Sequence, residues 1–135
     1  MKKIIIGGLL AGAFMLLMGM LFGALSSEIY KLSPKVFWKP MGGDWFTKVL
    51  VYDLASGLIF AWVFSIVKSS LPGPRLAKGL MFGIMMFMIG PFHALWMSYL
   101  VIAIRTKLLG IWMINGLVNY VFSGLIFELI DQKIS

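Results

Sequence analysis

Four side chains within the long apolar runs of this sequence could do chemistry inside a membrane: a carboxylate, an imidazole and two amides. They belong to Asp53, His93, Asn115 and Asn119. An ionisable group in such a run is a functional candidate, because burying its charge in hydrocarbon is costly. A carboxylate and an imidazole in one cavity would form a relay for protons or cations, since histidine titrates near neutral pH. We therefore predict that these four residues form one polar cluster.

Asp53 has two interpretations. As an interfacial carboxylate it would pair with Lys48 or with a lysine of the preceding connection, and its role would be structural. As a functional group it would face a neighbouring helix, because Gly57, Ala61 and Ser65 follow at steps of four residues and form a row of small side chains. Asn115, Asn119 and Ser123 also recur at steps of four, and they predict either hydrogen bonds between helices or the wall of a polar path.

Metal binding and catalysis have less support. Met86, His93 and Met97 are expected on one side of a helix, and a histidine with two thioethers could bind Cu(I). Methionine is also a common filler of apolar cores, so we favour a structural role and predict no metal and no cofactor. The sequence has no cysteine, one histidine, and no GxGD, GxSxG or HExxH motif, and we predict that it is not an enzyme.

The elements that must position these residues are membrane helices. Hydrophobic residues make up 61% of the 135 residues and charged residues 13%, a composition too apolar to cover a core with a water-facing surface. A secretory signal peptide is the alternative interpretation of the first apolar run. We favour a membrane-spanning helix, because the run is longer than the hydrophobic region of such a peptide. The pattern predicts one all-α domain, 1–135, a polytopic four-helix bundle with spans at 4–25, 49–67, 79–104 and 108–128.

The connection 26–48 contains prolines, a Gly-Gly pair, tryptophans and lysines. Indole rings and lysines are typical of the headgroup layer, so we expect a short hairpin or helix on the membrane surface.

Glycines mark the helix faces expected to pack closely. Gly8, Gly12, Gly19 and Gly23 fall on one face of the first span, and the same spacing recurs 71 residues later. Small residues let helix backbones approach each other in lipid. A looser echo relates Asp53-Gly57-Ala61 to Asn115-Asn119-Ser123. In the third span the repeated spacing comprises Gly79, Gly83, Gly90 and Ala94. Together these matches predict a duplicated helical hairpin whose two halves are parallel.

The distribution of basic residues gives only a weak preference for one orientation in the membrane. Six basic residues are expected on each side of the membrane, which also permits insertion in both orientations. Lys2 and Lys3 precede the first span, and the first helix usually dominates orientation, so we expect both termini in the cytoplasm.

Two stretches suggest a family. The opening Ile6-Gly7-Gly8-Leu9-Leu10-Ala11-Gly12 and the turn Pro72-Gly73-Pro74-Arg75, with four spans and a longer first loop, resemble a family of small bacterial inner-membrane proteins that has no assigned function. The resemblance implies a bacterial source, a multi-pass inner (plasma) membrane location and a four-helix membrane fold. Small multidrug resistance transporters fit less well, because their first span carries an acidic residue and this one does not.

Two function classes follow. The first is a structural or accessory subunit whose glycine faces bind its own spans, a second copy or a partner membrane protein. The alternative is a small transporter or channel in which the polar cluster lines a proton or cation path. The bilayer is the expected partner, and nucleic acid is not, because the basic residues lie at helix ends and in short connections.

Overall fold

A computed structural model describes residues 1–32 and 42–134, and within these ranges the chain is helical and has no strand. Four helical stretches are long and apolar enough to cross a membrane. This confirms the predicted all-α, four-helix architecture. The helices are α1 (Lys2–Leu25), α2 (Ser27–Lys31), α3 (Trp45–Val67), α4 (Arg75–Phe87), the π-helix η2 (Met88–Phe92), α5 (His93–Val101) and α6 (Thr106–Lys133), with α4, η2 and α5 together forming the third span.

The spans differ from the prediction mainly at their ends. The second span begins at Trp45 rather than at residue 49, because an ion pair fits its first turn: Lys48 Nζ lies 2.5 Å from Asp44 Oδ2. The predicted surface element 26–48 is therefore divided between the short helix α2 and the start of α3, and its residues 33–41 lie outside the described part of the chain. Trp112 Nε1 donates to Tyr30 Oη at 2.5 Å and ties α2 to α6.

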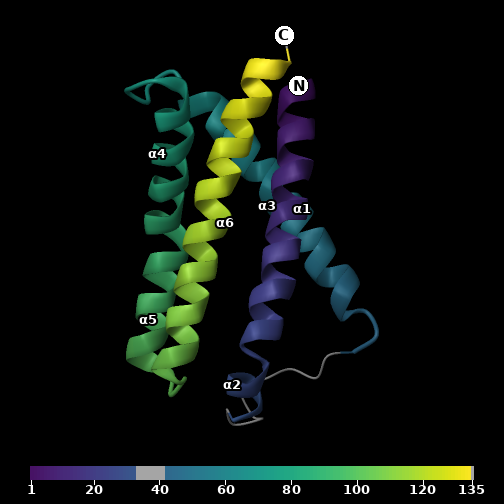
Figure 1. The fold of residues 1–135 in the computed structure, drawn as a ribbon, viewed down its shortest axis with the longest axis vertical. Coiled ribbons are helices and arrows are strands. Elements are labelled where there is room, and N and C mark those ends of the chain that lie inside the picture. Colours follow the sequence, from purple (N-terminus) through teal and green to yellow (C-terminus); the bar gives the residue numbers. More distant parts are fainter. Residues whose placement is uncertain (33–41, 135) are drawn as a thin grey trace.

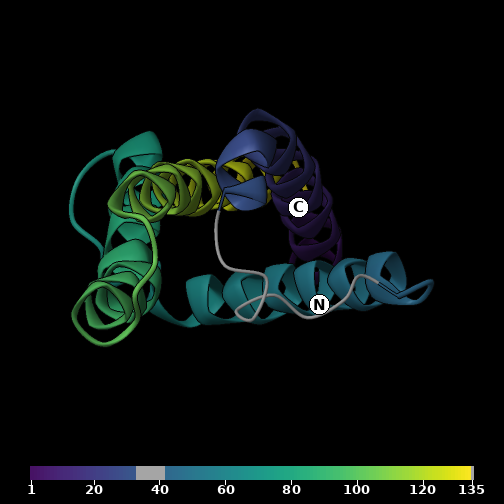
Figure 2. The same ribbon diagram turned by 90° about the horizontal axis from the view of Figure 1, so that it is seen from below.

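The helices are arranged as an open bundle. Helices α4, α6 and α1 lie side by side, and α3 runs obliquely across them (Figures 1 and 2). Helix α1 packs against both α3 and α6, and α4 packs against α6. The N-terminus and the end of α6 lie at the same end of the bundle (Figure 1).

Two of the packed pairs, α1 with α3 and α4 with α6, cross at glycines. A Cβ atom built on Gly57 would overlap the carbonyl oxygen of Gly8 and lie 2.6 Å from the amide nitrogen of Gly12. A Cβ on Gly124 would likewise overlap the carbonyl oxygen of Gly79. The backbones touch at both crossings, as the sequence predicted for Gly8, Gly12, Gly79 and Gly83.

The two crossings repeat the same contacts and so define the register of the duplication. A Cβ on Gly12 would meet the backbone of Asp53 and Leu54, both at 2.7 Å, and a Cβ on Gly83 would meet the backbone of Tyr120 and Val121. Asp53 thus corresponds to Tyr120, not to Asn115, and Gly57 corresponds to Gly124, not to Asn119. The predicted alignment of α3 with α6 was therefore wrong by five residues. Equivalent positions in the two helices are those whose backbones make the same contact at the crossing, and the spacing of small and polar side chains did not identify them.

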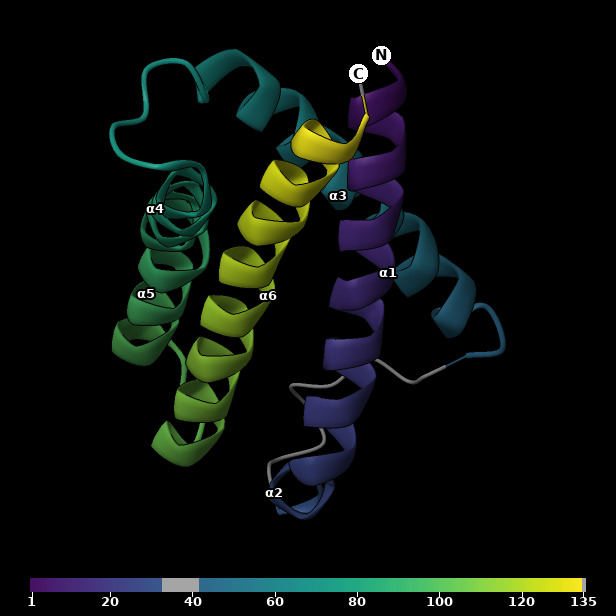
Figure 3. The same ribbon diagram turned by 45° about the horizontal axis from the view of Figure 1, so that its top comes forward.

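Three of the predicted packing glycines do not mediate helix contact. Among the described residues, a Cβ on Gly19 or Gly23 would have no atom within 4 Å, and one on Gly90 would meet only the hydroxyl of Tyr120, at 3.9 Å. The reason is the oblique course of α3, which leaves α1 beyond the crossing at Gly12 (Figure 3). Glycines that share one helix face therefore contact another helix only where the two helix axes come close together.

An aromatic core closes the end of the bundle that carries the termini. Phe64, Phe82 and Phe127 come from three different helices, are each at most 3% exposed, and have ring centroids 5.1–6.0 Å apart. An ion pair network lies at the same end, since Lys3 Nζ and Lys68 Nζ lie 3.2 and 2.6 Å from Asp131 Oδ1.

We expect Asp131→Asn to lower the free energy of unfolding by about 1 kcal/mol, because two partly exposed ammonium groups lose their shared carboxylate. The measurement is unfolding of the full chain in detergent. Glu28→Gln removes the exposed pair with Lys31 and is the control, expected to change stability by less than about 0.5 kcal/mol. Equal stability for the wild type and the Asp131 variant would contradict a stabilising role for the network.

Candidate functional site

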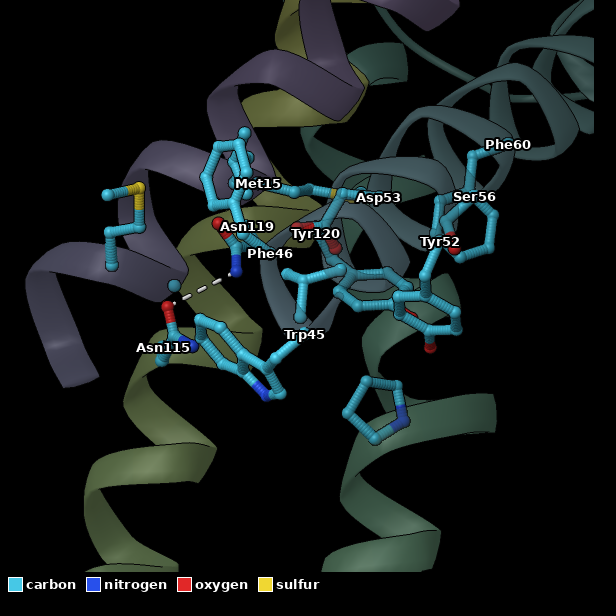
Figure 4. A pocket seen from close by; sticks show the side chains of 15 residues that line it. Met15, Trp45, Phe46, Tyr52, Asp53, Ser56, Phe60, Asn115, Asn119 and Tyr120 are labelled. Atoms are coloured by element: carbon cyan, nitrogen blue, oxygen red, sulfur yellow. Dashed lines mark hydrogen bonds between the residues drawn. The ribbon is translucent and has the colours of Figure 1, made fainter. Parts of the chain in front are cut away.

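A cavity of about 470 Å³ lies between α1, α3, η2 and α6 (Figure 4). Its wall combines one carboxylate, amides and hydroxyls with aromatic and aliphatic side chains. The lining residues are Met15, Leu16, Gly19, Met20, Trp45, Phe46, Val49, Tyr52, Asp53, Ser56, Phe60, Pro91, Asn115, Asn119 and Tyr120.

The cavity brings together three of the four residues in the predicted polar cluster. Asp53, Asn115 and Asn119 line it, from two helices distant in the sequence. His93 does not line it and is exposed at the first residue of α5. The third span contributes Pro91 in its place. The cause is η2, because the wider turn of a π-helix shifts the phase of every residue after it.

Asp53 lies deeper along its helix than the sequence suggested. It is eight residues beyond Trp45, the first residue of α3, or about 12 Å by helical rise, against roughly 6 Å expected from a start at residue 49. Lys48 pairs with Asp44 instead. Among the described residues Asp53 has no ion pair, and a pairing with Lys35 or Lys39 lies outside them. The structural interpretation through Lys48 is therefore not what the structure shows.

The asparagines hydrogen-bond within their own helix rather than between helices. Asn119 Nδ2 donates to Asn115 Oδ1 at 3.2 Å, and Ser123 Oγ donates to the backbone oxygen of Asn119 at 2.7 Å. The side-chain oxygen of Asn119 is buried and has no hydrogen-bond partner in the described part of the chain. An unsatisfied buried acceptor costs about 1–3 kcal/mol. Of the two predicted roles, the described contacts of these asparagines are not hydrogen bonds between helices. The two side chains form a polar strip on the cavity wall.

Sequence reasoning missed the aromatic part of the wall. Trp45 and Phe46 were assigned to the membrane surface, and Tyr52 and Tyr120 were not singled out, although all four line the cavity. The rings of Tyr120 and Phe60 pack with centroids 4.9 Å apart. The corrected register of the repeat would have provided the signal, because it makes Tyr120 the counterpart of Asp53.

The cavity is lined by equivalent positions of the two hairpins. In the corrected register Asp53 corresponds to Tyr120 and Tyr52 to Asn119, and all four line the cavity. In membrane transporters built from repeats, binding sites lie at the interface between the repeats and beside interrupted helices. Beside the cavity the third span stays helical and passes through the π-helix η2, which contains Pro91.

The residues considered for Cu(I) do not form a site. Met86 packs against the aromatic core, whereas His93 and Met97 are exposed. Within the described residues there is no group of three or more histidine, aspartate or glutamate side chains that could hold a metal ion.

Comparisons with known proteins add no functional assignment. No family model, no curated protein and no solved structure matches this chain.

Proposed function

We propose that this chain is a small membrane carrier that binds an organic cation in the cavity. The observation that carries the proposal is the Asp53 carboxylate, which lines the cavity without an ion pair among the described residues. Aromatic side chains of Trp45, Phe46 and Tyr52 line the same space. A carboxylate beside aromatic faces attracts a cation through both its charge and the ring quadrupoles.

The position of the cavity supports transport rather than catalysis. It lies between two equivalent hairpins, where rocking of one hairpin against the other would change access to a bound solute. The π-helix in the third span adds a point at which that span departs from regular α-helix. Both features fit alternating access around a fixed site.

Asp53→Asn tests the proposal, because it removes the charge and keeps the shape. We expect binding of tetraphenylphosphonium to the purified chain in nanodiscs to weaken at least tenfold, corresponding to about 1.4 kcal/mol or more. Uptake of the same cation into liposomes should fall in parallel. Asp44→Asn is the matched control, since Asp44 precedes the same helix and does not line the cavity.

Unchanged binding in the Asp53 variant would contradict the carrier proposal. It would then favour the accessory-subunit function. One observation already favours that second candidate: Gly19 and Gly23 of α1 leave open space where a helix of another chain could pack.

We further propose that the chain lies in the plasma membrane of a bacterium, with both termini in the cytoplasm. Lys2 and Lys3 at the start of α1 support this orientation, and the start of α1 and the end of α6 lie at one end of the bundle (Figure 1), which is consistent with it. A green fluorescent protein fused to the C-terminus should fluoresce, and an alkaline phosphatase fusion should be inactive. The reverse pattern would contradict the orientation, and activity of both fusions would indicate dual insertion.

A further inference from the structure

The internal repeat predicts that contacts between the hairpins come in pairs. Helices α1 and α6 are packed together, with the rings of Phe14 and Phe122 5.3 Å apart. In the repeat register, the counterpart of this α1–α6 interface is an interface between α3 and α4. These two helices meet at the ring contact of Phe64 with Phe82, near the end of the bundle that carries the termini. Beyond that contact they make no comparable interface among the described residues.

The cavity lies where the repeat would place the rest of the interface between α3 and the third span. Tyr52 of α3 and Pro91 of η2 both line it, yet α3 and η2 are not packed against each other in the described structure. Tyr52 is 70% exposed. Figures 1 and 3 show the first half of α3 leading away from the third span. Among the described residues no packed helix pair closes the side of the cavity between α3 and η2, and because these helices are long and apolar enough to cross a membrane, we infer that this side faces lipid.

The wall of the cavity combines polar and apolar groups. Asp53, Asn115 and Asn119 provide polar groups, whereas Met20 and Pro91 are apolar. A small hydrophilic cation would use only the polar part. A molecule with a cationic head and a hydrocarbon tail would match the charge at Asp53 and leave its tail in the lipid, where an alkyl chain is already favourably solvated.

We propose that the ligand is a single-chain amphiphile with a cationic head, which enters sideways from the bilayer between α3 and η2. This proposal rests on the carrier function above and names its substrate class. The head lies against Asp53, and the tail leaves the cavity between Tyr52 and Pro91. The aromatic rings of Trp45 and Phe46 add contacts to the head.

Matched probes test the two parts of the ligand separately. The full chain in phosphatidylcholine nanodiscs is titrated with dodecyltrimethylammonium, with tetramethylammonium and with dodecyl sulfate, and binding to empty nanodiscs is subtracted. With concentrations corrected for partitioning, we expect dodecyltrimethylammonium to bind at least tenfold more tightly than either other probe. Asp53→Asn should remove its advantage over dodecyl sulfate.

A second variant tests the route. The chain has no cysteine, so Tyr52→Cys labelled with a bulky, lipid-soluble maleimide places an obstacle at the lipid-facing side. The control is Trp62→Cys carrying the same label, because Trp62 is on the same helix, is 56% exposed and does not line the cavity. We expect the label at position 52 to weaken dodecyltrimethylammonium binding at least tenfold, and the label at position 62 to leave it unchanged.

The outcomes separate this inference from the carrier proposal. If tetramethylammonium binds as tightly as dodecyltrimethylammonium and depends on Asp53, the carrier function stands and the amphiphile inference is overturned. If no cation binds more tightly than dodecyl sulfate, both are overturned. Full dodecyltrimethylammonium binding with the label at position 52 would show that the bound tail does not pass between Tyr52 and Pro91, and would overturn the proposed route between α3 and η2 with it.

Discussion

Alanine at Gly57 or at Gly124 is expected to abolish the folded bundle, although the change adds a single methyl group. At position 57 the new Cβ would overlap the carbonyl oxygen of Gly8 and approach the amide nitrogen of Gly12 to 2.6 Å. At position 124 it would overlap the carbonyl oxygen of Gly79. The atoms in its way belong to backbone, so no rotamer change relieves the overlap and a whole helix must move. We expect a loss of about 3 kcal/mol or more, at the upper end of overpacking effects.

The measurement is the fraction of monodisperse protein in detergent, followed by thermal unfolding of whatever remains folded. Gly23→Ala is the matched control, because a Cβ there has nothing within 4 Å and alanine also has the higher helix propensity. We expect that variant to retain the yield and stability of the wild type. Gly12→Leu and Gly83→Leu should behave like the two crossing variants. Wild-type behaviour of Gly57→Ala would show that α1 and α3 do not touch as described.

The two crossings also show what the sequence could predict about the fold. Long apolar runs were sufficient to predict four membrane-spanning helices, because the bilayer requires such segments and leaves few alternatives. The glycine spacing predicted a repeat and correctly selected Gly8, Gly12, Gly79 and Gly83. It could not show that α3 crosses α1 obliquely, and so it wrongly extended the contact to Gly19 and Gly23. Crossing angles depend on side chains from several helices at once, and one helix face does not contain that information.

The sequence also predicted some residues of the candidate site and missed others. Asp53, Asn115 and Asn119 were predicted together from polarity alone, since polar groups in membrane helices avoid lipid. His93 was included because it is the ionisable group of the third span, but the π-helix at Met88–Phe92 changes the helical phase of the residues after it. Trp45 and Phe46 were missed because aromatic residues next to lysines usually indicate the membrane surface. Here they begin a tilted helix whose first turns line the cavity.

In the described part of the chain the helices are held together at the end that carries the termini and diverge toward the other end, and this difference has a mechanical consequence. Three phenylalanines and the Asp131 ion pairs hold four spans together near the termini. Toward the other end, α3 leaves α1 beyond Gly12, and the cavity occupies the space between the hairpins. A motion that opens or closes the cavity would therefore pivot about the aromatic core. The stability of that core and the function of the cavity should be separable by mutation.

Phe127→Ala is expected to destabilise the bundle by about 3 kcal/mol and to leave the cavity's polar residues in place. Phe127 is 3% exposed and its ring contacts those of Phe64 and Phe82, so truncation leaves a void that three helices cannot easily fill. Lipid does not supply the lost contacts, because the site is inside the protein. Unfolding of the full chain in detergent measures the change.

Leu129→Ala is the control, since Leu129 is on the same helix and 45% exposed; its truncation should cost less than about 0.5 kcal/mol. Phe127→Leu should recover more than half of the loss, because it refills most of the void. Below the unfolding temperature of the alanine variant, cation binding should remain within a factor of two of the wild type, since Phe127 does not line the cavity. Equal destabilisation by the Phe127 and Leu129 alanine variants would contradict the assignment of the core. A loss of cation binding by folded Phe127→Ala would show that the core and the cavity are not separable.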